Sequence, residues 1–464
     1  MEERRYQVEA IDLLRNHIGA GRRAPLLVMP TGSGKTVIFS EIAKKATKKG
    51  NNVLILVHRR ELIKQASRKL TDIGVEHGVI AAGFKPSKKT INVASVQTLV
   101  RRLEKIVWKP NLIIIDEAHH ACAGSWDKIL KHWPDAIKLG VTATPMRLDG
   151  RGLADYFDQI VLGPLIPALV KDKYLAPHRV FAPPFRADLS KIKTRGGDYA
   201  KDQLSQVMID EAATIMGDAV EQYRKHANGL PAIAFCVDVR HANFVTDRFN
   251  KAGYRAALIT GTMKMDDRDQ VIDDLTTGKI QILVSIDVVS EGFDLPLVSA
   301  CILLRPTKSL GLYMQQVGRI LRPQPGKTAI VLDHVRNTVT HGFIDETRDW
   351  DLNSKRKKNR GEAAPGVTVC EVCFAVYPSI ERTCPVCGHE RPSKKKELNF
   401  MAGDLVELKR EALSFRSVRR KTRARHREQA KARTLADLQA LGLKRGYSPG
   451  WAYMIYNSRK PKRR

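Results

Sequence analysis

Short apolar runs recur along the chain, each three to six residues long and separated by polar stretches or stretches of helical periodicity. The runs are apolar throughout rather than at alternate positions, which is typical of strands buried on both faces of a parallel sheet. One series lies at residues 26–28, 53–57, 91–96, 112–115 and 139–142, and a second at 232–237, 256–259, 280–284, 300–304 and 329–332. The pattern predicts an α/β protein with two similar domains, residues 1–170 and 171–345, joined near residues 165–180.

A glycine-rich stretch, MPTGSGKT at residues 29–36, follows the first apolar run and precedes a helical pattern. Its two glycines let backbone N–H groups wrap a polyphosphate, and the next helix adds its N-terminal dipole. Lys35 supplies positive charge, and the Thr36 hydroxyl can ligate Mg²⁺. Met29 stands where the GxxxxGKT pattern has its first glycine, so a plain glycine-rich turn stays open as the alternative.

An acidic pair, Asp116 and Glu117, follows the fourth run of the first series. Because parallel sheets bind ligands at the carboxyl ends of their strands, Asp116 is placed to hold Mg²⁺ through water, and Glu117 to orient or deprotonate an attacking water. Taken alone, such a pair is compatible with a surface turn. Together with the glycine loop about eighty residues earlier, it predicts Mg²⁺-dependent hydrolysis of a nucleoside triphosphate.

The charge of the chain points to a polyanionic partner. Its 464 residues carry a net charge of +30, and nucleic acid is the first candidate. Residues 391–464 hold 22 Lys or Arg against 6 Asp or Glu, so +16 of the net charge lies in this tail. The first five residues contain no apolar segment, and no apolar run approaches the length of about 18 residues that spans a bilayer, so we expect a cytoplasmic protein without a membrane partner.

Four of the seven cysteines cluster late in the chain. Two Cys-x-x-Cys pairs, Cys370 with Cys373 and Cys384 with Cys387, are separated by ten residues and offer four thiolates in two hairpin turns, which suits tetrahedral Zn²⁺. We expect a small zinc ribbon over residues 366–392, with disulfides or unrelated cysteines as the alternative. The other three cysteines lie in apolar surroundings and are interpreted as core residues.

The remaining segments are predicted from their charge and periodicity. Residues 346–365 are predicted to be a basic linker, of which residues 353–365 are solvated. Residues 393–434 are basic and compatible with a helix, which favours a nucleic-acid grip over a merely solvated helix. Residues 435–464 regain apolar periodicity and aromatic residues, which indicates a small helical element at the end of a basic C-terminal extension.

Six further motifs, taken with the glycine loop and the acidic pair, resemble those of the superfamily 2 helicases, specifically the DEAH-type members, from Arg4 to about Leu332. They are RRYQ at 4–7, HRREL at 58–62, ASVQT at 94–98, TATP at 142–145, SEGFD at 290–294 and QQVGRILR at 315–322. The resemblance implies two RecA-like domains with ATP between them. The last motif would bring arginine across the interdomain cleft, where a planar, permanently charged guanidinium suits the charge that develops on the γ-phosphate.

The site implied by these motifs has four groups of residues. The catalytic residues are Lys35, Asp116, Glu117, Arg319 and Arg322. The nucleotide-binding residues are Arg4 and Gln7, which read adenine, and Thr31, Gly32, Ser33, Gly34, Lys35, Thr36, Gly292 and Asp294. Thr36 and Asp116 hold Mg²⁺, the four clustered cysteines hold Zn²⁺, and Arg59, Arg60, Thr98 and Ser290 contact the nucleic-acid strand.

Three other features, PMRLDGRGL at 145–153, the cysteine cluster and RGYSPGW at 445–451, are similar to those of the RadD-like helicases of bacteria and their prophages. Those relatives are DNA-repair ATPases, so the resemblance implies DNA as the partner, with RNA not excluded and a single-stranded DNA-binding protein as a candidate protein partner. We therefore expect an ATP-dependent DNA helicase or translocase that acts in repair, recombination or replication and uses ATP, Mg²⁺ and Zn²⁺.

Two other functions stay open on the sequence. One is a nucleic-acid-stimulated ATPase that remodels protein complexes on nucleic acid without unwinding. The other is the motor subunit of a restriction system, although no acidic cluster of nuclease type stands out in the sequence.

Overall fold

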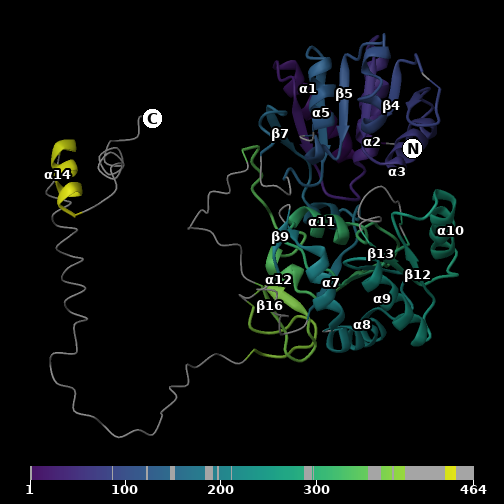
Figure 1. Ribbon diagram of the computed structural model, residues 1–464, viewed down its shortest axis with the longest axis vertical. Coiled ribbons are helices and arrows are strands. Elements are labelled where there is room, and N and C mark those ends of the chain that lie inside the picture. The colour runs from purple at the N-terminus through teal and green to yellow at the C-terminus, as the bar shows by residue number, and fades with distance from the viewer. Residues whose placement is uncertain are drawn as a thin grey trace, which may run out of the picture. The chain divides into compact units, whose positions relative to one another are not determined.

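The apolar runs of the first series form a seven-stranded parallel sheet with the order β3-β4-β2-β5-β6-β1-β7 (Figure 1). Its strands are β1 (Pro25–Val28), β2 (Val53–Val57), β3 (Gly78–Ile80), β4 (Ile91–Ser95), β5 (Leu112–Asp116), β6 (Ile137–Thr142) and β7 (Gln159–Leu162). β1, β2 and β5 are buried along their whole length, which explains their continuously apolar sequence. β3 and β7 lie at the two ends of the sheet and are only partly buried, so the apolar pattern does not reveal them.

The structure is a computed structural model. It describes residues 3–85, 87–121, 124–146, 152–182, 192–195, 198–210, 212–286, 295, 297–353, 367–378, 381–391 and 434–445. Residues Met1–Pro392 form one unit and Ser393–Arg464 a second. Among the helices in these ranges, none has the length and the apolar character that crossing a membrane requires.

Helices cover both faces of the first sheet. α1 (Arg5–Gly19), α2 (Lys35–Thr47) and α3 (Arg60–Asp72) share a core with Leu27 and Ile55. α4 (Val96–Leu99) and α5 (Gly124–His132) share another core with the neighbouring strand residues Leu26 and Leu54. Successive side chains of a strand point to opposite faces, so the sheet is the middle layer of a three-layer lobe.

The second series of runs forms a six-stranded parallel sheet with the order β12-β13-β11-β14-β15-β8. Its strands are β8 (His178–Phe181), β11 (Ala232–Phe235), β12 (Ala256–Ile259), β13 (Ile282–Ser285), β14 (Ala300–Leu303) and β15 (Ala329–Asp333). Its helices are α7 (Lys201–Asp210), α8 (Ala212–Ala227), α9 (Val239–Lys251), α10 (Met265–Thr276), α11 (Leu310–Gly318) and α12 (Asn337–His341), and α6 (Ile166–Lys171) lies between the two sheets in sequence. The expectation of two parallel-sheet α/β domains is confirmed, with β8 as an unpredicted strand at the end of the second sheet.

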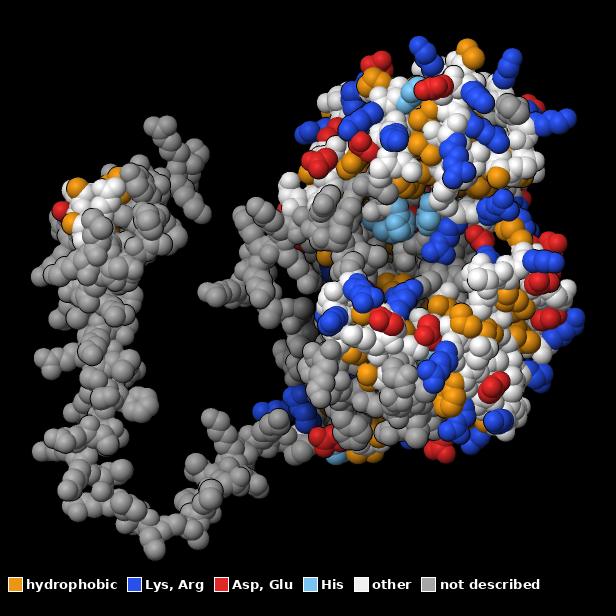
Figure 2. Space-filling model, viewed as in Figure 1, with side chains coloured by type: hydrophobic (Ala, Val, Ile, Leu, Met, Phe, Trp, Pro, Cys, Tyr) orange, Lys and Arg blue, Asp and Glu red, His pale blue; other side chains and the backbone are white. Residues whose placement is uncertain are grey.

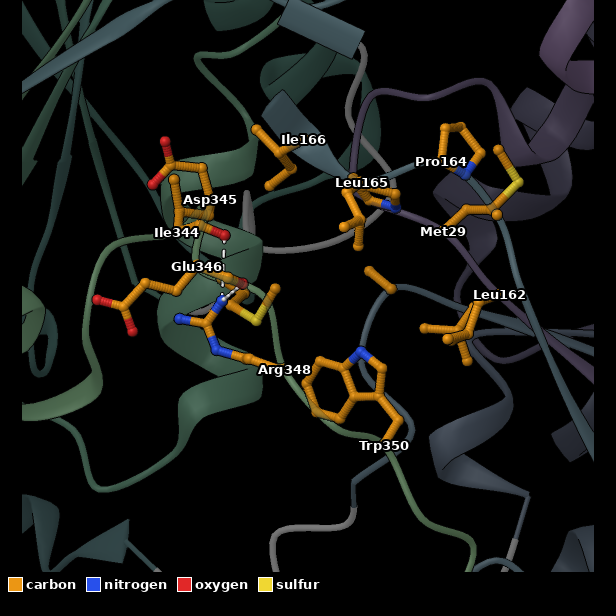
Figure 3. Close-up of a pocket in the computed structure, with 15 residues that line it drawn as sticks. Met29, Leu162, Pro164, Leu165, Ile166, Ile344, Asp345, Glu346, Arg348 and Trp350 are labelled. Carbon is orange, nitrogen blue, oxygen red and sulfur yellow. Dashed lines mark hydrogen bonds between the residues drawn. The ribbon is translucent and has the colours of Figure 1, made fainter. Parts of the chain in front are cut away.

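The segment 342–353 returns from the second lobe, built on the second sheet, to the first. The carbonyl of Leu352 accepts hydrogen bonds from the N–H groups of Leu153 and Ala154 at 2.7 and 3.2 Å, and Trp350 packs against the apolar cores of the first lobe. Figure 3 shows Trp350 beside Leu162, with Met29 of the glycine loop across a small pocket of about 50 Å³. The first part of the predicted basic linker, residues 346–353, is thus held to the first lobe by an apolar side chain and backbone hydrogen bonds. Residues 354–365 lie outside the described ranges.

The cysteine-rich segment forms a two-stranded antiparallel hairpin, β16 (Val367–Val369) and β17 (Val376–Pro378). The hairpin is attached to the second sheet, because Phe181 of β8 pairs with Ala375 and the N–H of Ala182 donates to the carbonyl of Phe374 at 2.9 Å. Its buried side chains join the core on that face of the sheet.

The second unit contains one described helix, α14 (Leu435–Arg445). Thr434 and Asp437 cap its start reciprocally: each side chain accepts a hydrogen bond from the other residue's backbone N–H, at 3.0 and 3.1 Å. The predicted basic helix before Thr434 and the aromatic residues after Arg445 lie outside the described ranges.

Candidate active site

The glycine loop connects β1 to α2 at the carboxyl end of the first sheet, as the sequence predicts. Gly32 and Gly34 both have φ of +84°, a left-handed conformation that side chains rarely adopt. A Cβ at Gly34 would lie 2.5 Å from Nε2 of Gln7, and one at Gly32 would lie 3.3 Å from the side chain of Leu175. The loop therefore requires glycine at both positions, for its backbone turn and for close packing.

Lys35 begins α2 with its ammonium inside the loop. Nζ lies 3.3 Å from the carbonyl oxygens of both Met29 and Pro30. Burial lowers the pKa of Lys35, the carboxylates of Glu117 and Asp116 raise it, and the guanidiniums of Arg319 and Arg322 lower it again. Two acidic groups from the first lobe and two basic groups from the second thus act on one ammonium.

The acidic pair ends β5, and both side chains are nearly buried. Oδ1 of Asp116 accepts the backbone N–H of Glu117 at 3.0 Å, and Glu117 has φ of +48°, which is strained for a residue with a side chain. Oε2 of Glu117 is buried, and its closest named neighbour is Nδ1 of His119 at 3.4 Å, which makes no hydrogen bond to it. A water molecule could donate a hydrogen bond to this buried carboxylate oxygen. The carboxylate of Asp116 and the hydroxyl of Thr36 offer oxygen ligands, the type that Mg²⁺ prefers.

A threonine pair after β6 links the acidic pair to the second lobe. Oγ1 of Thr142 makes hydrogen bonds of 3.0 Å with Nδ1 of His119 and of 3.1 Å with the backbone of Thr144. Thr144 is buried, and a Cβ at Gly311 of α11 would lie 3.2 Å from its Oγ1. The TATP motif therefore lies between the acidic pair and α11. Figure 2 shows histidine side chains gathered between the two lobes.

The predicted adenine-reading residues lie beside the glycine loop. Gln7 accepts the backbone N–H of Arg4 at 3.0 Å and donates to the Ser33 carbonyl at 3.4 Å. The Tyr6 hydroxyl donates to the same carbonyl at 2.7 Å. The guanidinium of Arg4 lies 4.8 Å from the ring centre of Tyr174, which belongs to none of the predicted motifs and also packs edge-on against the ring of Tyr6.

The QQVGRILR motif reaches the glycine loop from the second lobe. Gln315, Gln316 and Arg319 are buried, and a Cβ at Gly318 would lie 2.6 Å from Cβ of Thr31. α11 ends at Gly318, so the two arginines stand in the turn after the helix rather than on a helical face. Arg322 still lies against the loop, since its Cγ is 3.7 Å from the Cβ position of Gly32.

The residues predicted to contact nucleic acid lie at the carboxyl ends of β2 and β4, which are neighbours in the sheet. Arg59 and Arg60 begin α3, and Thr98 lies in α4. The two motifs are joined by a 3.0 Å hydrogen bond from the Gln97 side chain to the His58 carbonyl. The remaining predicted residues, Ser290, Gly292 and Asp294, lie outside the described ranges.

An ion pair between the lobes was not predicted. Nη1 of Arg268 in α10 lies 2.7 Å from Oε1 of Glu61 in α3, and both side chains are about 15% exposed. The exposed Lys64 and Asp269 form a second pair between the same helices at 2.9 Å. No local pattern could have shown these contacts, because the partners are more than two hundred residues apart.

The four clustered cysteines converge as the spacing predicts. Their sulfur atoms all lie within 4.8 Å of one another, with Cys370 and Cys387 at 3.6 Å and Cys373 and Cys384 at 3.6 Å. Tetrahedral Zn²⁺ with bonds of about 2.3 Å separates its sulfur ligands by about 3.8 Å. All four thiols are unbridged, so the disulfide alternative is not what the structure shows, and the set fits a zinc ion.

We expect the purified protein to carry one Zn²⁺ per chain and the Cys384→Ser variant to carry none. A structural zinc site contributes roughly 10–16 kcal/mol of apparent binding free energy, so its loss should unfold the hairpin around residues 366–392. Elemental analysis and limited proteolysis check the two results, with Cys236→Ser, a buried cysteine of the second lobe outside the cluster, as the control. Freshly reduced protein without zinc would contradict the assignment.

Comparison with known proteins gives the family. Residues 1–147 match the family model described as type III restriction enzyme, res subunit, and residues 215–324 match that described as helicase conserved C-terminal domain. The chain is 36% identical over 398 residues to the 51.5 kDa protein of Lactococcus phage (isolate 7-9), covering 83% of this chain and 84% of that protein. It is 34% identical over 340 residues to "Putative ATP-dependent helicase IRC3" of Saccharomyces cerevisiae, covering 69% of this chain but only 49% of the yeast protein.

A solved structure shares the fold of the two lobes. It is "the fragment structure of a putative HsdR subunit of a type I restriction enzyme from Vibrio vulnificus YJ016", with a TM-score of 0.59 at 22% identity over 75% of this chain and 66% of that one. The two parallel-sheet lobes of this chain agree with that structure in fold. The chain belongs to the superfamily 2 helicases.

Proposed function

We propose that the protein is a DEAH-type, RadD-like DNA helicase or translocase driven by ATP hydrolysis, acting in the cytoplasm in DNA repair, recombination or replication. The observation that carries the proposal is the convergence on Lys35 of Asp116 and Glu117 from one lobe and Arg319 and Arg322 from the other. A triphosphate bound at the glycine loop would meet cations on both sides of its γ-phosphoryl group, which phosphoryl transfer requires. Closure of the lobes around ATP would then be coupled to hydrolysis.

Each predicted residue has a role in this site. Lys35 binds the β- and γ-phosphates, and the backbone N–H groups of the glycine loop surround them. Mg²⁺, held by Thr36 and Asp116, would neutralise phosphate charge. Glu117 orients the attacking water and takes its proton; its Oε2 is buried and makes no hydrogen bond within the described residues, so it can accept one from water. Arg319 and Arg322 stabilise the charge on the γ-phosphoryl group while it is transferred from ADP to water.

The DNA strand would follow the carboxyl ends of β2 and β4. Arg59 and Arg60 supply positive charge and Thr98 a hydroxyl, the groups that commonly contact phosphates. Ser290 would contact the strand from the second lobe, and Gly292 and Asp294 the nucleotide, as the family resemblance implies. The basic balance of the chain and its relation to helicases support nucleic-acid binding, and the RadD-like motifs favour DNA over RNA.

ATP hydrolysis should be measured with single-stranded, duplex and forked DNA and with RNA, beside a strand-displacement assay on the forked substrate. We expect DNA to stimulate hydrolysis more than RNA, and forked DNA to be unwound. Stimulation without strand displacement or movement along DNA would leave an ATPase that remodels complexes. No hydrolysis with any nucleic acid would contradict the proposal.

A second candidate is the motor subunit of a restriction system. It is favoured by the family model for the first lobe and by the fold shared with an HsdR fragment. Such a motor would move along duplex DNA without separating its strands. Displacement of a third strand from a triplex, with no unwinding of forked DNA, would select this candidate.

The basic tail gives a separate prediction. Removing residues 394–464 should leave basal ATP hydrolysis near the parental rate, because the predicted hydrolysis motifs end by Arg322. DNA affinity should fall and its salt dependence should flatten, since each lost phosphate contact on a single strand lowers the log-log slope by about 0.7. Titrations at several salt concentrations measure the slope. An unchanged slope would show that the tail does not contact DNA.

A further inference from the structure

The hairpin β9 (Thr194–Arg195) and β10 (Asp198–Tyr199) lies in a part of the chain that neither family model covers. Thr194 and Tyr199 of this hairpin contact the Lys308 side chain of the second lobe, and Asp198 contacts the lobe with its carboxylate. Its side chain is only 14% exposed, although nothing in a two-residue strand requires a buried carboxylate. Burial of a charge is costly unless the charge is paired and hydrogen-bonded, so the contacts of Asp198 need an explanation.

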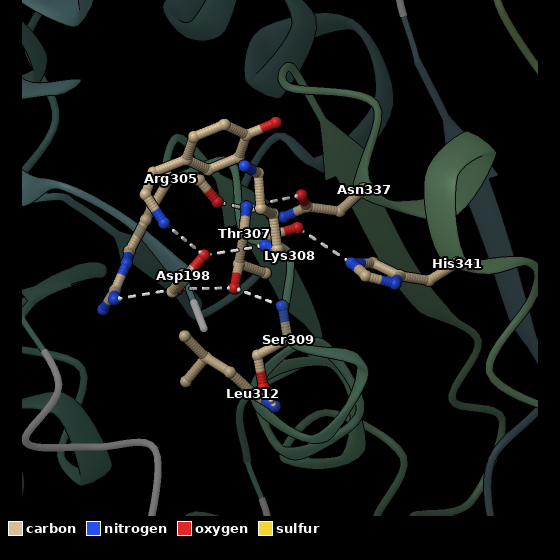
Figure 4. A network of polar contacts seen from close by, with 9 residues as sticks. Asp198, Arg305, Thr307, Lys308, Ser309, Leu312, Asn337 and His341 are labelled. Carbon is tan, nitrogen blue, oxygen red and sulfur yellow. Dashed lines mark hydrogen bonds and ion pairs between the residues drawn. The ribbon is translucent and has the colours of Figure 1, made fainter. Parts of the chain in front are cut away.

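Asp198 binds the loop between β14 and α11, residues 305–309 (Figure 4). Its carboxylate accepts hydrogen bonds from the Thr307 hydroxyl at 2.8 Å and from the Lys308 backbone N–H at 2.7 Å. It also lies 3.4 Å from Nη2 of Arg305, which is itself buried. One carboxylate thus contacts three residues of the loop, and its charge makes each hydrogen bond stronger than a neutral one.

The loop is held from its other side by α12. Asn337 accepts the N–H of Thr307 at 3.1 Å and donates to the carbonyl of Arg305 at 3.0 Å. A ring nitrogen of His341 bonds the carbonyl of Thr307 at 2.9 Å. Asp198 and α12 together fix the loop, and neither set of contacts duplicates the other.

The fixed loop begins α11 directly. Oγ1 of Thr307 accepts the N–H of Ser309 at 3.0 Å, and Oγ of Ser309 caps the helix by accepting the N–H of Leu312 at 3.1 Å. Figure 4 shows these residues in one line from Asp198 to the first turn of the helix. A continuous series of hydrogen bonds therefore connects Asp198 to the start of α11, so that a displacement of Asp198 would also displace the helix.

α11 has little freedom where it meets the first lobe. Near its start, a Cβ at Gly311 would lie 3.2 Å from Oγ1 of Thr144, and at its end a Cβ at Gly318 would overlap Thr31. Arg319 and Arg322 follow at once. Misplacement of a catalytic group by about 1 Å can cost on the order of 10²-fold in rate, so a small shift of the helix would matter.

We propose that Asp198 is a positioning residue for ATP hydrolysis: by fixing the loop 305–309 it sets where α11 delivers Arg319 and Arg322 against the glycine loop. This inference rests on the proposed ATPase function. In this proposal Asp198 acts through the two arginines and not by contact with the nucleotide.

The first test compares Asp198→Ala and Asp198→Asn with the parental protein in a single-turnover ATPase assay. We expect Asp198→Ala to lower the hydrolysis rate by about 10- to 100-fold while the Kd for a fluorescent ATP analogue changes less than twofold, because binding relies mainly on the first lobe. Asp198→Asn should recover part of the rate, since its amide oxygen can still accept the Lys308 N–H. Asp202→Asn is the matched control: Asp202 is 60% exposed and lies 3.7 Å from Arg195, outside the network.

The second test distinguishes positioning from loss of stability. Asp198→Ala should slow the Arg322→Ala variant by much less than it slows the parental protein, because only Arg319 is then left to be misplaced and changes that act through a shared group are not additive. A parental rate for Asp198→Ala, or full multiplication of the two losses, would overturn the inference. If Asp198→Ala does not fold, Thr307→Val, which removes the hydroxyl bond and keeps the shape, decides by the same two measurements. A parental protein that hydrolyses no ATP would instead contradict the proposed function.

Discussion

Replacing Glu117 with Gln is expected to lower the rate of ATP hydrolysis by about 10²- to 10⁴-fold, the usual contribution of a general base, while ATP still binds. The amide keeps the size of the side chain but cannot take a proton from water. The left-handed backbone at this residue and its unbonded buried oxygen are the structural reasons for placing the water there. Single-turnover hydrolysis and binding of a fluorescent ATP analogue measure the two effects separately.

Two further variants serve as comparisons for Glu117→Gln. Lys35→Ala should lose both hydrolysis and tight ATP binding, since its ammonium lies inside the loop that receives the phosphates. Glu104→Gln removes an exposed carboxylate of the same lobe, in η1 (Leu103–Lys105), and should behave like the parental protein. Parental hydrolysis by Glu117→Gln would show that this residue does not prepare the water.

Replacing Arg322 with Ala is expected to slow hydrolysis by about 10³-fold, the lower end of the effect of an arginine finger, with little change in ATP affinity. Arg322 reaches the glycine loop from the opposite lobe and acts on the same ammonium as the acidic pair. Its charge is needed most in the transition state, while the γ-phosphoryl group is transferred from ADP to water, so the loss should fall on kcat rather than on binding.

The variant Arg322→Lys separates charge from shape. Lysine keeps the positive charge but lacks the planar fork of donors, so an intermediate rate is expected. Steady-state kinetics of both variants give kcat and KM. A loss of less than tenfold in Arg322→Ala would remove the residue from this role.

The strands that are clearest in the sequence are those that are buried on both faces, because such strands need apolar side chains at nearly every position. β2 and β5 carry only apolar side chains up to their last residue because helices cover both of their faces. β8 escapes the pattern because it carries a His and an Arg and stands about fifty residues before the next strand of its sheet. The apolar pattern therefore predicts the centre of each sheet and the end strand β12, and it misses the other end strands, β3, β7 and β8.

The residues of the site also fall into those that the sequence predicts and those that it does not reveal. The phosphate-binding loop and the acidic pair are visible in sequence because their chemistry fixes residue types at short spacing. Tyr174, Arg268 and Asp198 were missed because each works through partners brought close only by folding; Asp198 and Arg305 are 107 residues apart. Long-range contacts of this kind leave no period or local spacing to read.

The attachment of the cysteine hairpin to β8 also bears on how the protein behaves in solution. β8 is an edge strand, and unpaired edge strands present backbone groups that can template pairing with another chain. The hairpin covers part of that edge through the backbone of Phe181 and Ala182. Metal bound far from the nucleotide would therefore protect against aggregation, and a chain stripped of its metal would self-associate while its ATP site is still intact.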